Sequence, residues 1–241
     1  MKIALVDSRI DNLAKIALLK EGFYIIETTP SQKLPEATSG HSDMLLFRDG
    51  NKIISSAEYC EAAPYIFEDI SRLVPNVSLS FTDDSFSKEY PHDALFNALV
   101  IGKRLFAKTD SVSRAVIAYA EEKGYGIIHV KQGYPACTVL PLGDSAAITA
   151  DEGMAKVMSE NGIKVSLIRN GNISLPPYDY GFIGGAAGVF RDKVYFIGSY
   201  ETHPDASIIE NAVKEAGFTP VSLSPAPLAD LGRIVFFEGN V

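Results

Sequence analysis

Short acidic side chains and a single cysteine stand just before several apolar runs of this sequence. Asp43 precedes Met-Leu-Leu and Cys137 precedes Thr-Val-Leu, and the other members of the set are Asp93, Asp179 and Asp230. Carboxylates clustered in a cleft of low dielectric repel one another and therefore favour a cation. A planar guanidinium matches such a cluster best because it donates hydrogen bonds in bidentate pairs. We expect a small cationic or guanidino ligand, although short acidic side chains also cap turns and strand ends.

Cys137 is the candidate nucleophile. Cys137 and Asp93 each close a motif that begins with Tyr-Pro, which puts them at equivalent places in two neighbouring units. A thiol attacks carbon when a base removes its proton and a third group orients that base. We expect His92 to be the base, with His41 as the alternative, and Asp93 or Asp43 to orient the imidazole. The other interpretation is that Cys137 is a small buried hydrophobic residue at the start of a strand.

Further polar residues near the expected strand starts complete the candidate site. The substrate-binding set comprises Asp43, His41, Asn97, Asp179, Asp230 and Arg233. Asn97 and Arg233 are suited to a carboxylate, as are Lys131 and Gln132. An amino-acid-like ligand with opposite charges at its two ends is therefore a further expectation.

A metal site is not expected from the spacing of the ligand-type residues. His41 and Asp43 lie far along the chain from His92 and Asp93, and no ligand pair has the spacing of one helix face. The two cysteines, Cys60 and Cys137, form neither a disulfide framework nor a Cys-x-x-Cys pair. We therefore expect no metal and no other cofactor, and a reducing compartment.

The composition excludes several classes of partner. The 241 residues carry 22 Lys plus Arg against 30 Asp plus Glu, a formal net charge of −8, and 46% are hydrophobic. An acidic chain without a basic cluster is a poor match for a nucleic-acid backbone. No apolar stretch approaches the length of a membrane span, and the first residues read as a strand rather than a signal peptide. We expect a cytoplasmic monomer or homodimer without a nucleic-acid or membrane partner.

The elements that must position these residues form a repeat. Hairpin turns between apolar runs recur roughly every 50 residues, an interval typical of repeat and propeller-like arrays. The turns are centred on Gly50, Gly102, Gly143, Asp192 and, in the turn 238–240, Gly239. Each turn is followed by a helix and then by a third apolar run, so the expected unit is strand, turn, strand, helix, strand.

Helix boundaries follow the same repeat. The expected helices span residues 11–21, 57–73 with an interruption at Pro64, 110–123, 151–161 and 204–216. Four of them stop at a glycine in the position that ends helices in the left-handed conformation, namely Gly22, Gly124, Gly162 and Gly217. A doubly wound α/β sheet is the competing interpretation, but four internal hairpins argue against it because that fold places a helix between successive strands.

Five such units close into a ring when the last is shared between the two ends of the chain. The strand expected at 234–237 then pairs with the strand at 3–6, which removes the exposed sheet edges. The predicted fold class is α/β, a five-fold pseudosymmetric α/β propeller of ββαβ units around a central pocket, in a single domain over residues 1–241. Equivalent strand starts converge on the axis of such a ring, so the acidic residues and Cys137 would rim one end of the pocket.

This architecture resembles the pentein superfamily, the fold of the guanidine-group-modifying enzymes such as the amidinotransferases. The segments Gly133-Tyr134-Pro135-Ala136-Cys137 and Tyr178 to Gly185 are similar to those of a small branch of that superfamily. The resemblance implies the five-unit ring and chemistry at a guanidino or related C–N bond, by a hydrolase or a transferase. The same superfamily includes the ribosome anti-association factor, which has no catalytic role.

The resemblance fails at two catalytic positions. The enzyme members have a histidine after a Gly-Gly pair and a nucleophilic cysteine near the C-terminus, whereas Ala186-Ala187-Gly188 follow Gly184-Gly185 here and no cysteine lies between Ser222 and Val241. The expected function is therefore binding of a small cationic or guanidino compound in an acidic central pocket. Its hydrolysis by a non-standard catalytic set is one extension, and a non-catalytic scaffold for a protein or assembly partner is the alternative.

Overall fold

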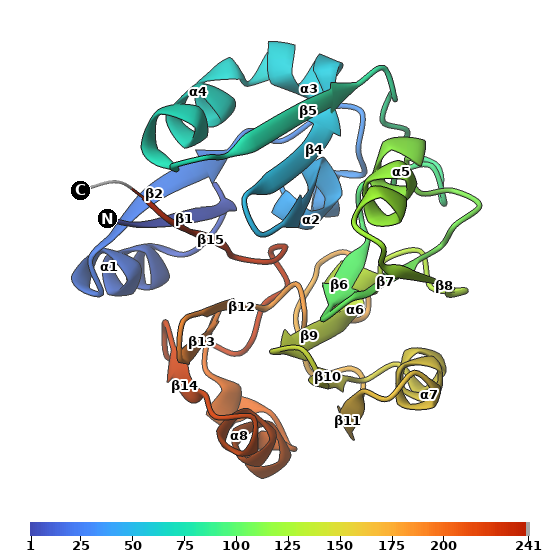
Figure 1. Cartoon of the computed structure of the whole chain (residues 1–241). Helices are drawn as coiled ribbons and strands as arrows, with labels where there is room; N and C mark the ends of the chain where they lie inside the picture. The colour runs from blue at the N-terminus through green and yellow to red at the C-terminus, as the bar shows by residue number, and fades with distance from the viewer. Residues whose placement is uncertain (240–241) are drawn as a thin grey trace.

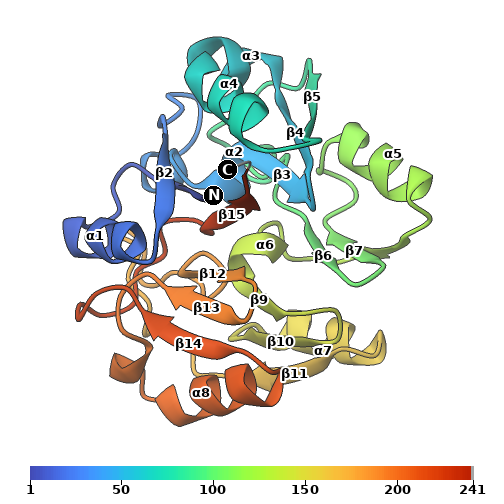
Figure 2. The same ribbon diagram turned by 60° about the vertical axis from the view of Figure 1, so that its left-hand side comes forward.

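Five small sheets stand around a central axis. The computed structural model describes residues 1–239 and groups its strands into five sheets of three strands each. Figures 1 and 2 show the sheets arranged as the blades of a ring, with the longer helices on its outside. This is the predicted five-fold pseudosymmetric α/β propeller.

The blade that begins at Leu46 shows how each unit is built. Strand β3 (Leu46–Asp49) pairs antiparallel with β4 (Lys52–Ser56), and β4 pairs parallel with β5 (Ser78–Thr82). The parallel pair requires a crossover, which here consists of α3 (Ala57–Ala62) and α4 (Pro64–Leu73). Pro64 begins α4, in the first turn where proline is tolerated, so the interruption expected at this residue is confirmed.

The remaining blades repeat this order of inner strand, middle strand, helix and outer strand. The second comprises β6 (Leu99–Ile101), β7 (Arg104–Ala107), α5 (Arg114–Glu122) and β8 (Gly126–His129). The third comprises β9 (Val139–Leu142), β10 (Ala146–Thr149), α7 (Glu152–Glu160) and β11 (Lys164–Leu167). The fourth comprises β12 (Ala187–Phe190), β13 (Lys193–Phe196), α8 (Ala206–Glu215) and β14 (Thr219–Ser222).

The fifth blade joins segments from opposite parts of the chain. Strand β1 (Lys2–Asp7) pairs parallel with β2 (Phe23–Thr28) across helix α1 (Asn12–Lys20), and antiparallel with β15 (Val235–Glu238). Ile3 lies opposite Phe237 in this register. The predicted closure of the ring by these two segments is confirmed.

Glycine conformation fixes most of the boundaries as expected. The hairpin glycines Gly50, Gly102 and Gly143 have φ between +55° and +70°, and the four glycines expected to end helices also have positive φ. Two details differ from the prediction. In the fourth hairpin Arg191, rather than Asp192, has the positive φ, at +54°. Helix α5 begins four residues later than predicted, because Ser113 caps it by accepting a hydrogen bond from Ala115 N. The turn expected at 238–240 extends to Asn240, which lies outside the described residues.

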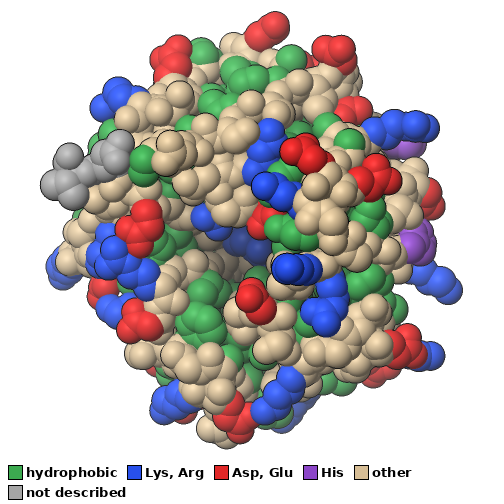
Figure 3. Space-filling model, in the orientation of Figure 1, with side chains coloured by type: hydrophobic (Ala, Val, Ile, Leu, Met, Phe, Trp, Pro, Cys, Tyr) green, Lys and Arg blue, Asp and Glu red, His purple; other side chains and the backbone are tan. Residues whose placement is uncertain are grey.

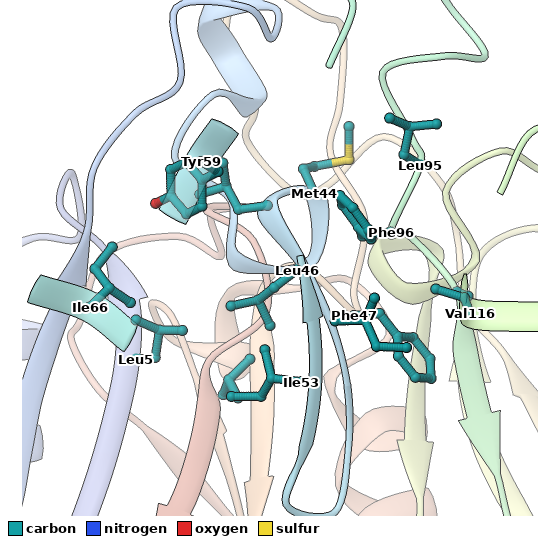
Figure 4. Close-up of a cluster of buried hydrophobic side chains, with 14 of the residues drawn as sticks. Leu5, Met44, Leu46, Phe47, Ile53, Tyr59, Ile66, Leu95, Phe96 and Val116 are labelled. Atoms are coloured by element: carbon teal, nitrogen blue, oxygen red, sulfur yellow. The ribbon is translucent and has the colours of Figure 1, made fainter. Parts of the chain in front are cut away.

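Apolar side chains fill the space between neighbouring blades. Figure 4 shows Leu5, Leu46, Ile53 and Ile66 gathered between strands and helices of the first and fifth blades, and all four are almost completely buried. Such packing fixes the inner strands β3, β6, β9, β12 and β15 around the axis, and with them the segments that enter these strands. None of the helices described within residues 1–239 is long and apolar enough to cross a membrane.

Candidate functional site

An acidic hollow of about 330 Å³ opens where the inner strands begin. Its wall is formed by Thr38, His41, Met44, Asp93, Tyr134, Cys137, Leu175, Tyr178, Asp179, Tyr180, Phe182 and Asp230. The residues come from the segments that enter four of the five blades and from the loop before β12. Their convergence on the axis is the arrangement expected for equivalent strand starts.

Two one-turn helices place the reactive side chains. Helix α2 (Ser42–Leu45) runs directly into β3, and its N-cap residue is His41. Helix α6 (Pro135–Thr138) runs directly into β9 and carries Cys137. A turn of helix at the entrance to a strand shifts the chain toward the axis, so Asp43 and Cys137 meet although 94 residues separate them in sequence.

The loop before β12 passes unusually close to this cluster. A Cβ atom on Gly184 would lie 2.3 Å from Val139 O and 2.4 Å from Ala136 O, and one on Gly185 would lie 2.0 Å from Asp230 Oδ1. Both glycines are therefore required by close approach of the backbone rather than by a turn. Gly185 N donates to Cys137 O at 2.9 Å, which ties this loop to the cysteine.

Cys137 is buried at the bottom of the hollow. Asn97 Nδ2 donates to its sulfur at 3.0 Å, while Asn97 Oδ1 accepts a hydrogen bond from Ala136 N at 2.8 Å. Burial raises the pKa of the thiol well above its usual value, and the carboxylates of Asp43 and Asp230 raise it further. The thiol therefore stays protonated at neutral pH until a positive charge enters the hollow.

His41 and Asp230 lie beside the cysteine and are also buried. His41 Nδ1 lies 3.7 Å from Asp230 Oδ1, and within residues 1–239 neither ring nitrogen of His41 has a hydrogen-bond partner. Asp230 accepts hydrogen bonds from Phe182 N at 2.9 Å and Gly232 N at 3.2 Å. Burial raises the pKa of Asp230 to about 6, and His41 opposes this shift.

The outer part of the hollow combines a carboxylate with aromatic rings. Tyr134 Oη donates to Asp93 Oδ2 at 2.6 Å, and burial raises the pKa of Asp93 while this hydrogen bond lowers it. The second oxygen, Asp93 Oδ1, is buried and has no partner among the described residues. Asp179 and Tyr178 are exposed at the mouth.

The structure does not bring His92 to Cys137. The His92 side chain is exposed and forms no part of the wall of the hollow, because the residue precedes the buried start of its unit and faces solvent. His41 takes the place beside the thiol. The expected placement of His92 beside Cys137 is therefore wrong, and His41, the alternative histidine, lies there instead.

Arg233 also lies elsewhere than expected. Its Nη2 donates to Ala136 O at 2.8 Å and to Val139 O at 3.0 Å, and its backbone N lies 3.4 Å from Asp43 Oδ2. Arg233 and Asp43 line a second hollow, of about 180 Å³, toward the other end of the axis. The expected contact of Arg233 with a ligand carboxylate in the acidic hollow is thus not supported by its position.

The second hollow contains a further arginine that the sequence analysis missed. Arg48 Nη2 donates to Phe236 O at 2.9 Å, its guanidinium lies over the ring of Phe237, and burial lowers its pKa to about 10. Figure 3 shows a depression near the centre of the molecular surface with Lys or Arg side chains inside it. The two hollows therefore differ in charge, and the pair formed by Asp43 and Arg233 lies between them.

Three neighbouring side chains, two from the wall of the acidic hollow and Asp43 beside them, have the donor types that bind metal ions. One nitrogen of His41, one oxygen of Asp43 and the sulfur of Cys137 lie within 4.8 Å of one another, and all three residues are buried. Sequence spacing gave no indication of this group, because its members come from two blades. Tyr134 was likewise missed, although it stands in the Tyr-Pro motif that pointed to Cys137.

The comparisons with known proteins agree with this architecture. A family model described as a family of unknown function (DUF6873) matches residues 5–235. No curated protein matches the sequence. Similar solved structures include a dimethylarginine dimethylaminohydrolase from Pseudomonas aeruginosa in complex with citrulline, with a TM-score of 0.58, 12% identity, and coverage of 93% of this chain and 91% of that one.

Two further structures extend the likeness. The amidinotransferase SxtG of Microseira wollei has a TM-score of 0.53 and 13% identity, with 87% of this chain and 72% of that chain covered. Agmatine deiminase from C. jejuni has a TM-score of 0.53 and 7% identity, with 92% and 76% covered. At these identities the likeness establishes the fold, which is that of the pentein superfamily. The family model covers almost the whole chain, so the chain belongs to the family of unknown function DUF6873, and its fold is that of the penteins.

Proposed function

We propose that the acidic hollow binds a small guanidino or amidino cation that carries no carboxylate. The main support is that the charged side chains of the wall are all acidic. Asp93, Asp179 and Asp230 line it, whereas no Lys or Arg of residues 1–239 does. A ligand carboxylate would therefore be repelled by three like charges with no Lys or Arg to offset them, while a guanidinium would meet acceptors for its paired N–H groups.

The shape of the hollow supports the same ligand class. Tyr134, Tyr178, Tyr180 and Phe182 form walls around the carboxylates. Aromatic faces attract cations and also cover an alkyl stem. A volume of about 330 Å³ admits a short alkylguanidine and excludes a peptide chain.

Cys137 and His41 supply a route to hydrolysis. A bound cation lowers the pKa of the thiol by the same Coulomb interaction through which Asp43 and Asp230 raise it. The thiolate sulfur then bonds to the amidino carbon, the bond from that carbon to the leaving amine breaks, and the amine departs with the proton that His41 took from the thiol. Water next attacks the same carbon, the carbon–sulfur bond breaks and a urea-type product leaves. One proton of the water restores the thiol, and the other passes through His41 to solvent.

The test compares ligands that differ only in charge pattern. Binding is measured by thermal shift and calorimetry with agmatine, arginine, methylarginines and polyamines, in the presence of a chelator. Saturation at about 100 times Kd stabilises by roughly 2.7 kcal/mol, which for a chain of this size is a shift of about 5–11 °C. We expect agmatine to give a larger thermal shift and tighter binding than arginine. Product release is then assayed in wild type, Cys137→Ser and the control Cys60→Ser.

Three outcomes would contradict all or part of the proposal. Equal shifts with arginine and agmatine would mean that the charge of the wall does not select the ligand. No shift with any cation would remove the binding function and leave the scaffold interpretation. Turnover in Cys137→Ser equal to that in Cys60→Ser would overturn the catalytic part alone.

A further inference from the structure

We propose that His41, Asp43 and Cys137 form a binding site for a single zinc ion at the bottom of the acidic hollow. This inference goes beyond the proposed ligand and does not depend on it. It requires only the three side chains and their immediate surroundings, all of which lie on the inner ends of two blades.

The donor atoms are already close to the geometry of a metal site. Zinc bonds of about 2.0 Å to nitrogen or oxygen and about 2.3 Å to sulfur put tetrahedral ligands roughly 3.3–3.8 Å apart. The three donor atoms lie within 4.8 Å of one another. Small side-chain rotations therefore suffice to close the site, without movement of α2 or α6.

Unpartnered buried atoms provide the second observation. His41 is 0% exposed, and in the described part of the chain both of its ring nitrogens lack a hydrogen-bond partner. Asp43 Oδ1 is also buried and has no hydrogen-bond partner among the described residues. Burial of a polar atom without a partner costs free energy. One bound ion would satisfy an atom of each residue at once.

The neighbours of the three residues suit an outer shell around a metal. Asn97 donates an N–H group to the sulfur of Cys137, as expected for a thiolate ligand. Asp230 lies 3.7 Å from His41 Nδ1, where a small movement would allow the hydrogen bond that orients a metal-bound imidazole. The charges also balance, since the thiolate and the carboxylates of Asp43 and Asp230 carry three negative charges while Zn²⁺ and the buried Arg233 carry three positive ones.

The mixed donor set favours zinc over the hard cations. Sulfur and imidazole ligands suit Zn²⁺, whereas Mg²⁺ and Ca²⁺ take oxygen ligands almost exclusively. Three protein ligands leave a fourth position, and His41 and Cys137 line the hollow toward which that position opens. Zinc and an organic cation use the same negative charges, so we expect them to exclude each other.

The test uses Zn²⁺ and Co²⁺ alone, with no organic ligand present. Chelator-treated protein is titrated with Zn²⁺ by calorimetry and with Co²⁺ by absorbance, where a thiolate ligand gives a charge-transfer band in the near ultraviolet. We expect one ion per chain and a band in wild type, in Cys60→Ser and in His92→Asn. We expect Cys137→Ser to lose the band, and Asp230→Asn to bind roughly 10–100 times more weakly.

Asp43→Asn and His41→Asn test the site independently, in case the Cys137→Ser variant does not fold. Both are checked by circular dichroism and should weaken Co²⁺ binding by at least roughly the factor expected for Asp230→Asn, because each removes a direct ligand. A wild-type protein without the band, or a band retained in Cys137→Ser, would overturn the site. Guanidino binding is measured with a chelator present and metal binding without an organic ligand. A negative result in one experiment therefore does not decide the other.

Discussion

At the residue scale, the carboxyl of Asp230 links the hollow to pH. Burial raises its pKa from 3.8 to about 6, so the folded chain holds this proton more tightly than the unfolded one. The group therefore costs stability above pH 6, and the cost disappears as pH falls toward 4. At 1.36 kcal/mol per pKa unit the full effect is about 3 kcal/mol. Asp230→Asn should gain stability relative to wild type by up to that amount between pH 4 and 7, measured by urea unfolding. Asp179→Asn, at the exposed mouth, is the control and should show no such trend.

The same carboxyl governs the pH dependence of cation binding. A guanidinium binds the ionised form of Asp230, so its affinity should rise up to roughly tenfold per pH unit below about pH 6 and level off above it. Calorimetry with agmatine at pH 5 and pH 7.5 measures this dependence. A pH-independent affinity would place the ligand away from Asp230.

The thiol of Cys137 is governed by its carboxylate neighbours. Burial raises the pKa of Cys137 most and Asp43 raises it further, so Asp43→Asn should increase the thiolate fraction and speed alkylation by iodoacetamide several-fold at pH 7.5. The rate is measured by mass spectrometry in a Cys60→Ser background after removal of metals. An unchanged or slower rate in Asp43→Asn would show that access, rather than charge, limits this thiol.

At the element scale, the loop before β12 fixes how near the blades approach the axis. Gly184→Ala places a methyl group against three backbone oxygens, those of Ala136, Cys137 and Val139. We expect a loss of about 3 kcal/mol or more in the free energy of unfolding, the upper range for overpacking. Gly126→Ala is the matched control because its Cβ would have only one neighbour, at 3.9 Å, and the φ of Gly126 is not positive. Equal stability of the two variants would contradict the tight packing at the axis.

At the scale of the whole molecule, stability depends on closure of the ring. Phe236 of β15 packs against Phe23, Phe190 and Tyr195, with ring centroids 4.8 to 5.5 Å apart. Phe236→Ala should lower the free energy of unfolding by about 3–5 kcal/mol, measured by urea denaturation. Tyr24→Ala, on the exposed face of the same sheet, should cost less than about 1 kcal/mol. Similar losses in both variants would mean that this aromatic cluster does not hold the closing blade.

The sequence by itself determined the blade repeat, the four internal hairpins, the glycines that end the helices and the ring closure. These depend on hydrophobic period and on local backbone preferences, such as those of Gly50 and Gly124, which act over a few residues. It also indicated the set of residues at the axis, since equivalent strand starts converge in any closed ring. The single-domain organisation and the roles of these residues remain predictions.

Only the tertiary structure decided which of these side chains meet. His41 rather than His92 lies beside Cys137, and Arg233 faces the second hollow rather than the acidic one. The direction of each side chain depends on one-turn helices at the strand entrances and on how closely Gly184 and Gly185 let the blades approach. Such contacts join segments about a hundred residues apart, and no local pattern of residue types encodes them.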